Sequence, residues 1–200
     1  MGKYFCSDGF RGIANEQLLP VHAYRVGRVI GGACRASGGN SAVVIGRDTR
    51  CSCDLIESAF LSGVLASGAD AFRAGVIPTN GIAFLTKENG FRFGVMITAS
   101  HNSFENNGIK IFDACGEKIS DQLTQEIEEY LDGDDLLPLA VKEKIGRIIE
   151  YPEGREQYIR HISSKIGCRA QSPTSYRTAR YIYPPHEKIY RCRASCSVPR

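Results

Sequence analysis

A polar segment between positions 98 and 110 contains the side chains best suited to group-transfer chemistry. It reads Thr-Ala-Ser-His-Asn-Ser-Phe-Glu-Asn-Asn-Gly-Ile-Lys and directly follows an apolar run at 94–97. A serine hydroxyl between small and polar neighbours can act as a nucleophile, and histidine or lysine can move a proton or neutralise a phosphate. Ser100, His101 and Lys110 are therefore candidate catalytic residues.

The same segment also suits an ordinary turn between two strands with polar filler. Asn106, Asn107 and Gly108 favour a tight turn. Isolated Ser-His pairs are common, and a nucleophile is identified by its geometry and not by residue type. Residue types alone leave both interpretations open.

Hydrophobic periodicity predicts alternating strands and helices around this segment. The predicted strands span 42–46, 71–77, 94–97, 108–112 and 145–149. The predicted helices span 17–36, 55–67, 81–87, 120–132 and 153–166. This alternation predicts a three-layer α/β/α domain with a mostly parallel or mixed sheet. The polar segment would then follow the carboxyl end of a strand, where such folds bind ligands.

Two helix starts carry recognisable capping residues. Asp54 followed by Glu57 predicts a capping arrangement for the helix at 55–67. Ser120 predicts an N-cap for the helix at 120–132, which should end at Gly133. Pro20 is compatible with the first turn of the helix at 17–36.

The chain divides into three parts by composition. Residues 1–150 form the predicted α/β/α domain, residues 151–167 form a helix leading out of it, and residues 168–200 form an irregular basic tail. The tail holds seven Lys or Arg against one acid and lacks periodicity, so we expect it to be disordered.

Composition indicates a soluble protein whose body does not bind nucleic acid or membranes. The net charge is +3, yet the cations concentrate in the tail instead of forming a patch on the folded part. No apolar stretch approaches the ~20 residues that span a bilayer, and no apolar signal segment follows Met1. We therefore expect a cytoplasmic location.

Eight cysteines are scattered along the chain, and most are expected to be thiols. Cys51-x-Cys53 has the wrong spacing for a usual zinc or redox pair. A metal site can be assembled in the tail only by picking out Cys168, Cys192, Cys196 and His186, whose spacing is not that of a usual zinc site.

Four segments resemble the α-D-phosphohexomutase superfamily. They lie at 98–102 with 107–110, at 3–15, at 44–50 and at 75–79, in the family's order and spacing. The opening Ser7-Asp8-Gly9-Phe10-Arg11-Gly12 is most similar to the bacterial phosphoglucosamine mutase branch. The resemblance extends from residue 3 to about residue 166.

The resemblance implies phosphoryl transfer between the 6- and 1-positions of glucosamine phosphate through a bisphosphorylated sugar. Ser100 would carry the phosphoryl group, and one phosphoserine oxygen would ligate Mg²⁺. Lys110 and His101 match positions near the transferred phosphate, and Arg11 matches an active-site arginine. Arg47, Asp48 and Arg50 have a simpler interpretation as structural residues that pin a loop by hydrogen bonding.

The chain departs from the family pattern at several positions. Cys6 replaces a glycine, Ser7 a threonine, Asn80 a proline and Ser103 a proline. Cys6 would be strained if its backbone needs a positive φ. Ser103 should leave the loop around Ser100 less constrained than proline would.

Two alternative functions remain. A phosphoglucomutase or phosphomannomutase would act by the same chemistry, and a non-catalytic fragment or interaction module would use the basic tail. Family enzymes also carry an Asp-x-Asp-x-Asp-Arg metal loop in a second domain, which is absent here. We therefore expect this polypeptide to be incomplete for turnover.

The abrupt loss of pattern after Gly167 motivates the hypothesis of a truncated or frameshifted product. We expect one of the other two reading frames of the encoding DNA to continue into an aspartate-rich metal loop. Sequencing the region downstream of residue 167 checks this, and two frames without such a loop would contradict it.

Overall fold

The computed structural model describes residues 2–6, 9–36 and 42–165. Met1–Ile162 form one compact unit, and the chain from Ser163 belongs to a second. The predicted irregular tail at 168–200 lies outside the described residues.

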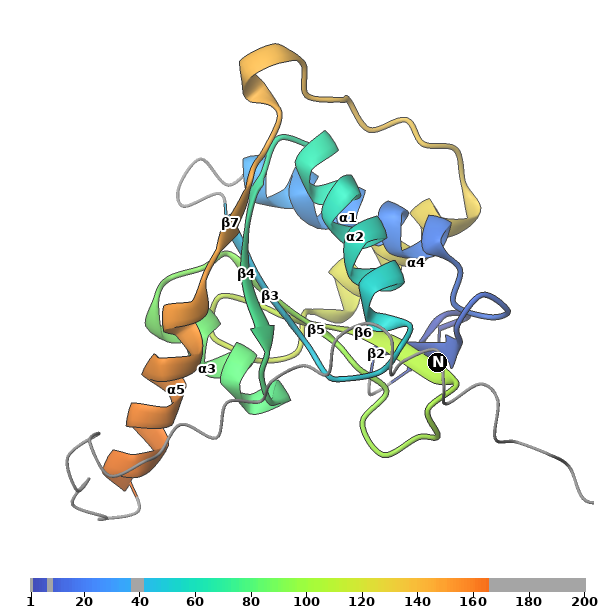
Figure 1. Cartoon of the computed structure of the whole chain (residues 1–200). Coiled ribbons are helices and arrows are strands. Elements are labelled where there is room, and N and C mark those ends of the chain that lie inside the picture. The colour runs from blue at the N-terminus through green and yellow to red at the C-terminus, as the bar shows by residue number, and fades with distance from the viewer. Residues whose placement is uncertain (1, 7–8, 37–41, 166–200) are drawn as a thin grey trace, which may run out of the picture. The chain divides into compact units, whose positions relative to one another are not determined.

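Seven strands form one mixed sheet in the order β1-β2-β6-β5-β3-β4-β7. Figure 1 labels the strands of this sheet from β2 to β7. The strands are β1 Phe5–Cys6, β2 Gly9–Ile13, β3 Ala42–Arg47, β4 Asp70–Val76, β5 Phe93–Ile97, β6 Asn106–Phe112 and β7 Ile148–Glu150. Strands β5, β3, β4 and β7 run parallel to one another, whereas β1, β2 and β6 pair antiparallel. The predicted α/β/α fold is therefore confirmed, with the sheet mixed.

Five α-helices and one short 3₁₀ turn accompany the strands within the described residues, and α5 follows the last strand. They are α1 Pro20–Ala36, α2 Cys53–Ala66, α3 Thr79–Glu88, α4 Asp121–Asp132, the turn Lys142–Lys144 and α5 Pro152–Lys165. Helix α1 begins at Pro20, three residues after the predicted start at 17, and ends at Ala36 as predicted. None of the helices in the described ranges has the length and apolar character needed to cross a membrane.

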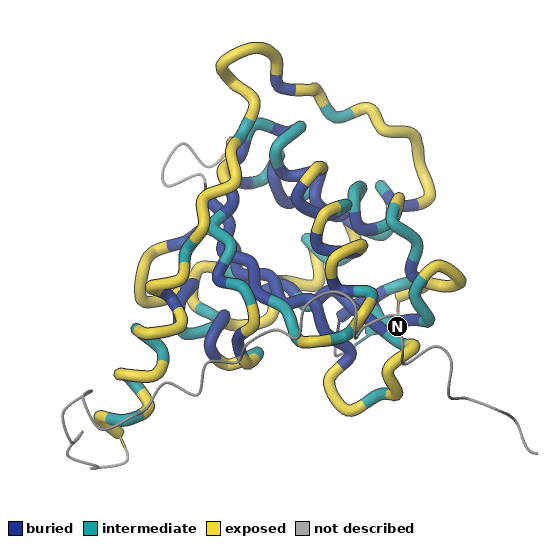
Figure 2. The backbone as a smooth tube through the Cα atoms, in the orientation of Figure 1, coloured by how far each residue is buried: buried dark blue, intermediate teal, exposed yellow. Residues whose placement is uncertain are grey.

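The sheet separates two apolar layers, which explains why its central strands are continuous apolar runs. Val43 and Ile45 pack with α1, α2 and α4, whereas Val44 packs with α3 on the opposite face. Every residue of β5 is buried (Figure 2). A strand covered on both faces has no polar side, so polar side chains that could react lie beyond its end.

One predicted helix cap is confirmed and one is wrong. Ser120 accepts a hydrogen bond from the Leu123 amide at the start of α4. Helix α2 instead begins after Ser52, which makes no side-chain cap bond. Asp54 and Glu57 instead form ion pairs with Arg47 at the end of β3. A charged partner competes with the helix amides for these carboxylates.

Cys6, which stands where the family has glycine, adopts an ordinary backbone conformation. Cys6 pairs with Gly9 across the β1–β2 ladder. It is absent from the described non-glycine residues with positive φ, and its thiol donates to the Gly9 carbonyl at 3.2 Å. The positive φ of 99° in this hairpin falls on Gly9.

Helices α1 and α2 approach closely because glycines face each other across their interface. A Cβ on Gly27 would overlap the Phe60 carbonyl oxygen, and one on Gly63 would overlap the Tyr24 carbonyl oxygen. Both overlaps involve backbone, which cannot rotate away. This interface fixes α2, and therefore the turn that precedes it, against the sheet.

We expect Gly27→Ala to lower the free energy of unfolding by about 1–3 kcal/mol through overpacking. Gly32→Ala is the matched control in the same helix, because a Cβ at Gly32 would come no closer than 3.9 Å to an atom outside that helix, Leu137 Cδ1. The control should gain roughly 0.5–1 kcal/mol from helix propensity. Denaturant titration compares the two, and equal effects would contradict the close approach.

Candidate functional site

The loop between β5 and β6 presents Ser100 to solvent. Ser100 and His101 are both exposed, and residues 103–105 are exposed as well. Ser100 has φ 57°, a left-handed conformation that residues other than glycine seldom adopt. Asn102 N donates to Ala99 O at 3.1 Å, which closes a turn directly around the serine. The hydroxyl is therefore carried on a tight turn and does not point into the core.

A threonine hydroxyl links the Ser100 backbone to the adjacent strand end. Thr98 Oγ1 accepts a hydrogen bond from the Ser100 amide at 2.9 Å. The same hydroxyl donates to Asp48 Oδ2 at 2.7 Å. Asp48 follows β3, so this bridge ties the serine turn to the parallel half of the sheet.

Arg50 binds the backbone of the loop from the other side. Its Nη1 donates to Ser103 O at 2.5 Å and to Asn106 O at 3.0 Å. Its Nη2 donates to Ser100 O at 2.8 Å and to Asn102 O at 3.0 Å. Its Nε donates to Asp48 Oδ2 at 2.9 Å. The predicted loop-pinning role is thus observed for Asp48 and Arg50.

Asn107 anchors the end of the loop where β6 begins. Its Nδ2 donates to Ser52 Oγ at 2.9 Å, and its Oδ1 accepts from the Gly108 amide at 2.8 Å. The side chain is buried, so both polar ends need these partners. Ser52 precedes α2, which connects the loop to the helix held by the glycine interface.

We call the residues that hold the Ser100 loop, namely Asp48, Arg50, Thr98 and Asn107, the loop anchor. Asp48 is the charged centre of this anchor. Burial alone would raise its pKa, but hydrogen bonds from Thr98, the Arg50 amide, Cys53 and the Arg50 guanidinium hold the pKa below its usual value. Burial raises the pKa of Cys53 to about 12, so this thiol is a neutral donor to Asp48. The carboxylate is therefore ionised at neutral pH, and the anchor weakens only on acidification through the lowered pKa.

Strand pairing brings the two predicted cations to one face of the sheet. Arg11 pairs with Gly108, and Lys110 pairs with Met96. Their neighbours Phe10 and Ile109 point into the α1 core, so Arg11 and Lys110 face the other side. A Cβ on Gly108 would lie 2.9 Å from Arg11 Cγ, which places the Arg11 side chain across the start of β6.

Lys110 is adjacent to the loop in the sheet, yet its ammonium points along β6. Its Nζ lies 5.5 Å from the centre of the Phe112 ring. Phe112 is two residues further from the loop on the same face. Lys110 would therefore need a change of rotamer to reach a phosphate on Ser100.

The described residues do not by themselves fit a magnesium site. They contain no group of three or more His, Cys, Asp or Glu that could hold a metal. Both Asp48 oxygens already accept hydrogen bonds. A phosphate on Ser100 would contribute oxygen ligands, whereas Mg²⁺ requires near-octahedral coordination by oxygens. The described residues would therefore leave most of the coordination shell of the ion unfilled.

The cysteines of the described residues are free thiols. Cys51 is exposed in the turn before α2, whereas Cys53 is buried against Asp48 and Asn107. Cys168, Cys192 and Cys196 lie outside the described residues, together with His186.

Residue types and spacing do not single out Thr98 or Asn107 as residues that hold the loop. They do predict that Arg47 pins the loop together with Asp48 and Arg50. Arg47 instead pairs with Asp54 and Glu57. The available signal was an Asp-x-Arg sequence directly after a buried strand, at positions 48–50. Arg47 is the last residue of β3, whereas Arg50 lies in the turn after it, and residue types alone do not distinguish which of the two turns toward the loop.

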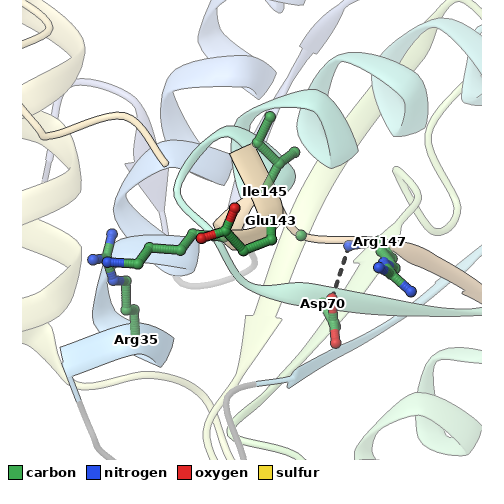
Figure 3. Close-up of a pocket in the computed structure, with 8 residues that line it drawn as sticks. Arg35, Asp70, Glu143, Ile145 and Arg147 are labelled. Carbon is green, nitrogen blue, oxygen red and sulfur yellow. Dashed lines mark hydrogen bonds between the residues drawn. The ribbon is translucent and has the colours of Figure 1, made fainter. Parts of the chain in front are cut away.

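A hollow lies at the end of the sheet opposite the Ser100 loop. It has a volume of about 470 Å³, and its lining includes Arg35, Asp70, Glu143, Ile145 and Arg147 (Figure 3). Asp70 Oδ1 accepts a hydrogen bond from the Arg147 amide at 2.8 Å. Asp70 begins β4, whereas Ser100 follows the carboxyl end of the parallel strand β5. This hollow is therefore separate from the serine loop.

The fold and the loop together define an α/β/α domain that presents the exposed Ser100 at a strand end. The family model described as phosphoglucomutase/phosphomannomutase, alpha/beta/alpha domain I, matches residues 2–137. This chain belongs to that family.

Known relatives agree with the assignment. The chain is 47% identical over 172 residues to a phosphoglucosamine mutase of Brevibacillus brevis, covering 84% of this chain and 38% of the relative. It is 44% identical over 167 residues to that of Geobacillus thermodenitrificans, covering 83% and 37%. A phosphoglucomutase/phosphomannomutase family protein from Burkholderia thailandensis superposes with a TM-score of 0.67 at 28% identity, covering 80% of this chain and 35% of that protein. The chain thus spans well under half the length of these proteins.

Replacing Ser100 tests its left-handed backbone. At an unstrained position, alanine is usually more stable than glycine by roughly 0.5–1 kcal/mol. At φ 57° the side-chain penalty of ~1–2 kcal/mol favours glycine. We expect Ser100→Gly to be at least as stable as Ser100→Ala in denaturant titration. An alanine variant more stable by the usual margin would contradict the conformation.

Proposed function

We propose that this chain is the phosphoryl-carrying domain of a phosphoglucosamine mutase. The observation that carries the proposal is the exposed Ser100, held on an anchored turn at the end of a buried strand. The family membership and the named relatives support the reaction class. The substrate would be glucosamine 6-phosphate or glucosamine 1-phosphate, exchanged through the bisphosphate.

Each half of the exchange is a phosphoryl transfer between two oxygens. Phosphorylated Ser100 would lose its P–O bond as a sugar hydroxyl oxygen forms a new one, and the serine oxygen would recover a proton. Ser100 would then attack the other phosphate of the bisphosphate and return its proton to the sugar oxygen. The protein regains its phosphoserine, so the reaction needs no external phosphate donor per turnover.

The neighbouring side chains would handle charge and protons. His101 lies beside Ser100 on the exposed loop and can move the proton. Arg11 can donate charge-assisted hydrogen bonds to the phosphate, and Lys110 can do so after turning from Phe112. A Mg²⁺ ion would neutralise charge on the transferring group when bound, with a Ser100 phosphate oxygen as its ligand from this domain and other ligands from outside the described residues.

The proposed organisation assigns the phosphoserine domain to residues 1–150 and a connecting helix to residues 151–167. The residues beyond 167 carry no proposed catalytic part. We also propose that the protein is cytoplasmic and that its ligands are phosphosugars. The proposal includes no binding to nucleic acid or to membranes. A phosphoglucomutase or phosphomannomutase is the second candidate, because the matching family model carries both names.

Incubation with glucosamine 1,6-bisphosphate tests the phosphoryl-carrying role. We expect the intact mass to increase by one phosphoryl group, located on Ser100 by peptide mapping. Ser100→Ala should gain none. Absence of phosphate on the unmodified chain, or phosphate on another residue, would contradict the proposal. Glucose and mannose bisphosphates in parallel distinguish the two mutase candidates.

The cations are tested in the same assay. Arg11→Gln and Lys110→Met should each slow phosphorylation, because each removes a donor from the transferring phosphate. Lys87→Met removes an exposed lysine from α3 and is the matched control. Rates equal to that of the control in both variants would argue against a role for these cations.

A further inference from the structure

Every N–H donor of the Arg50 guanidinium group makes a hydrogen bond to the Ser100 loop or to Asp48. An arginine side chain has five N–H donors. Four of the hydrogen bonds go to backbone carbonyls between positions 100 and 106, and the fifth goes to Asp48. The Arg50 side chain is only 10% exposed, so water does not replace these partners.

The convergence of four carbonyls has a physical consequence. Carbonyl oxygens carry partial negative charge, and four of them turned toward one point repel each other unless a cation lies between them. Lysine has the same charge, but its three donors on a single atom cannot reproduce the planar fork. The bent shape of the loop therefore depends on a guanidinium supplied by a different segment of the chain.

The residue at the centre of this loop is conformationally unfavourable. Ser100 has φ 57°, and such backbones persist when the surroundings over-determine them. Its carbonyl is held by Arg50, and its amide is held by Thr98. Both sides of the strained residue are thus tied, through Asp48, to the end of β3.

We propose that Arg50 is a positioning residue for phosphoryl transfer, which holds the Ser100 hydroxyl in its transfer-competent orientation without contacting the phosphate. Its kinetic consequence rests on the proposed function, whereas its effect on the loop does not. A merely structural arginine would stabilise the fold without controlling the order of this loop.

Arg25 supplies a matched control for that distinction. Its Nη1 also donates to backbone carbonyls, at Tyr130, Leu131 and Gly133, at 2.6–3.1 Å. These carbonyls belong to the end of α4 and not to the Ser100 loop. Arg25→Lys should therefore destabilise the protein in the same manner while leaving the loop unchanged.

The experiment compares Arg50→Lys and Arg25→Lys with the unmodified chain in three measurements. They are the free energy of unfolding, the hydrogen exchange of the Ser100, Asn102 and Asn106 amides, and the rate of Ser100 phosphorylation by glucosamine 1,6-bisphosphate. Arg50→Lys should raise exchange at these amides at least tenfold. It should also slow the maximal phosphorylation rate at least tenfold, with little change in the bisphosphate concentration at half-maximal rate. Arg25→Lys should change neither.

The outcomes separate this inference from the proposed function. Unchanged loop exchange in Arg50→Lys would overturn the positioning role, whatever the phosphorylation result. Faster exchange with an unchanged phosphorylation rate would overturn it as well. If the unmodified chain acquires no phosphate, the proposed function fails, while raised exchange specific to Arg50→Lys still supports control of the loop by Arg50.

Discussion

The hydrogen bonds between Arg50, Asp48 and the Ser100 loop are the interaction on which the site depends. Asp48 is ionised because its donors outweigh the burial that opposes charge. It holds Arg50, which in turn holds four carbonyls of the loop. Without this ion pair, the exposed serine would lie on a loop whose own turns are closed by few hydrogen bonds.

The fold places these groups at one edge of the sheet. Parallel pairing of β3 with β5 aligns their carboxyl ends, so Asp48 meets Thr98. Antiparallel pairing of β2 with β6 brings Arg11 beside Gly108. The α1–α2 interface holds the turn that contains Arg50. The site thus draws on both halves of the mixed sheet and belongs to no single segment.

The sequence predicts the local elements better than the contacts between them. The apolar runs at 42–46 and 94–97 and the cap at Ser120 correspond to β3, β5 and α4. Strands β1 and β2 are not predicted, because both are short and are defined by pairing: β1 pairs with β2, and β2 pairs with β6 about a hundred residues later. The choice of Arg50 over Arg47 as the anchor, and the turning of Lys110 toward Phe112, depend on side-chain directions that periodicity does not specify.

A crystal structure of the chain phosphorylated at Ser100 tests the central claim most directly. We expect a positive φ at Ser100, the phosphate in solvent on the Arg11 face, and the Arg50 guanidinium on the same four carbonyls. A serine side chain turned into the core, or an Arg50 side chain detached from the loop, would contradict the dependence of the site on this anchor.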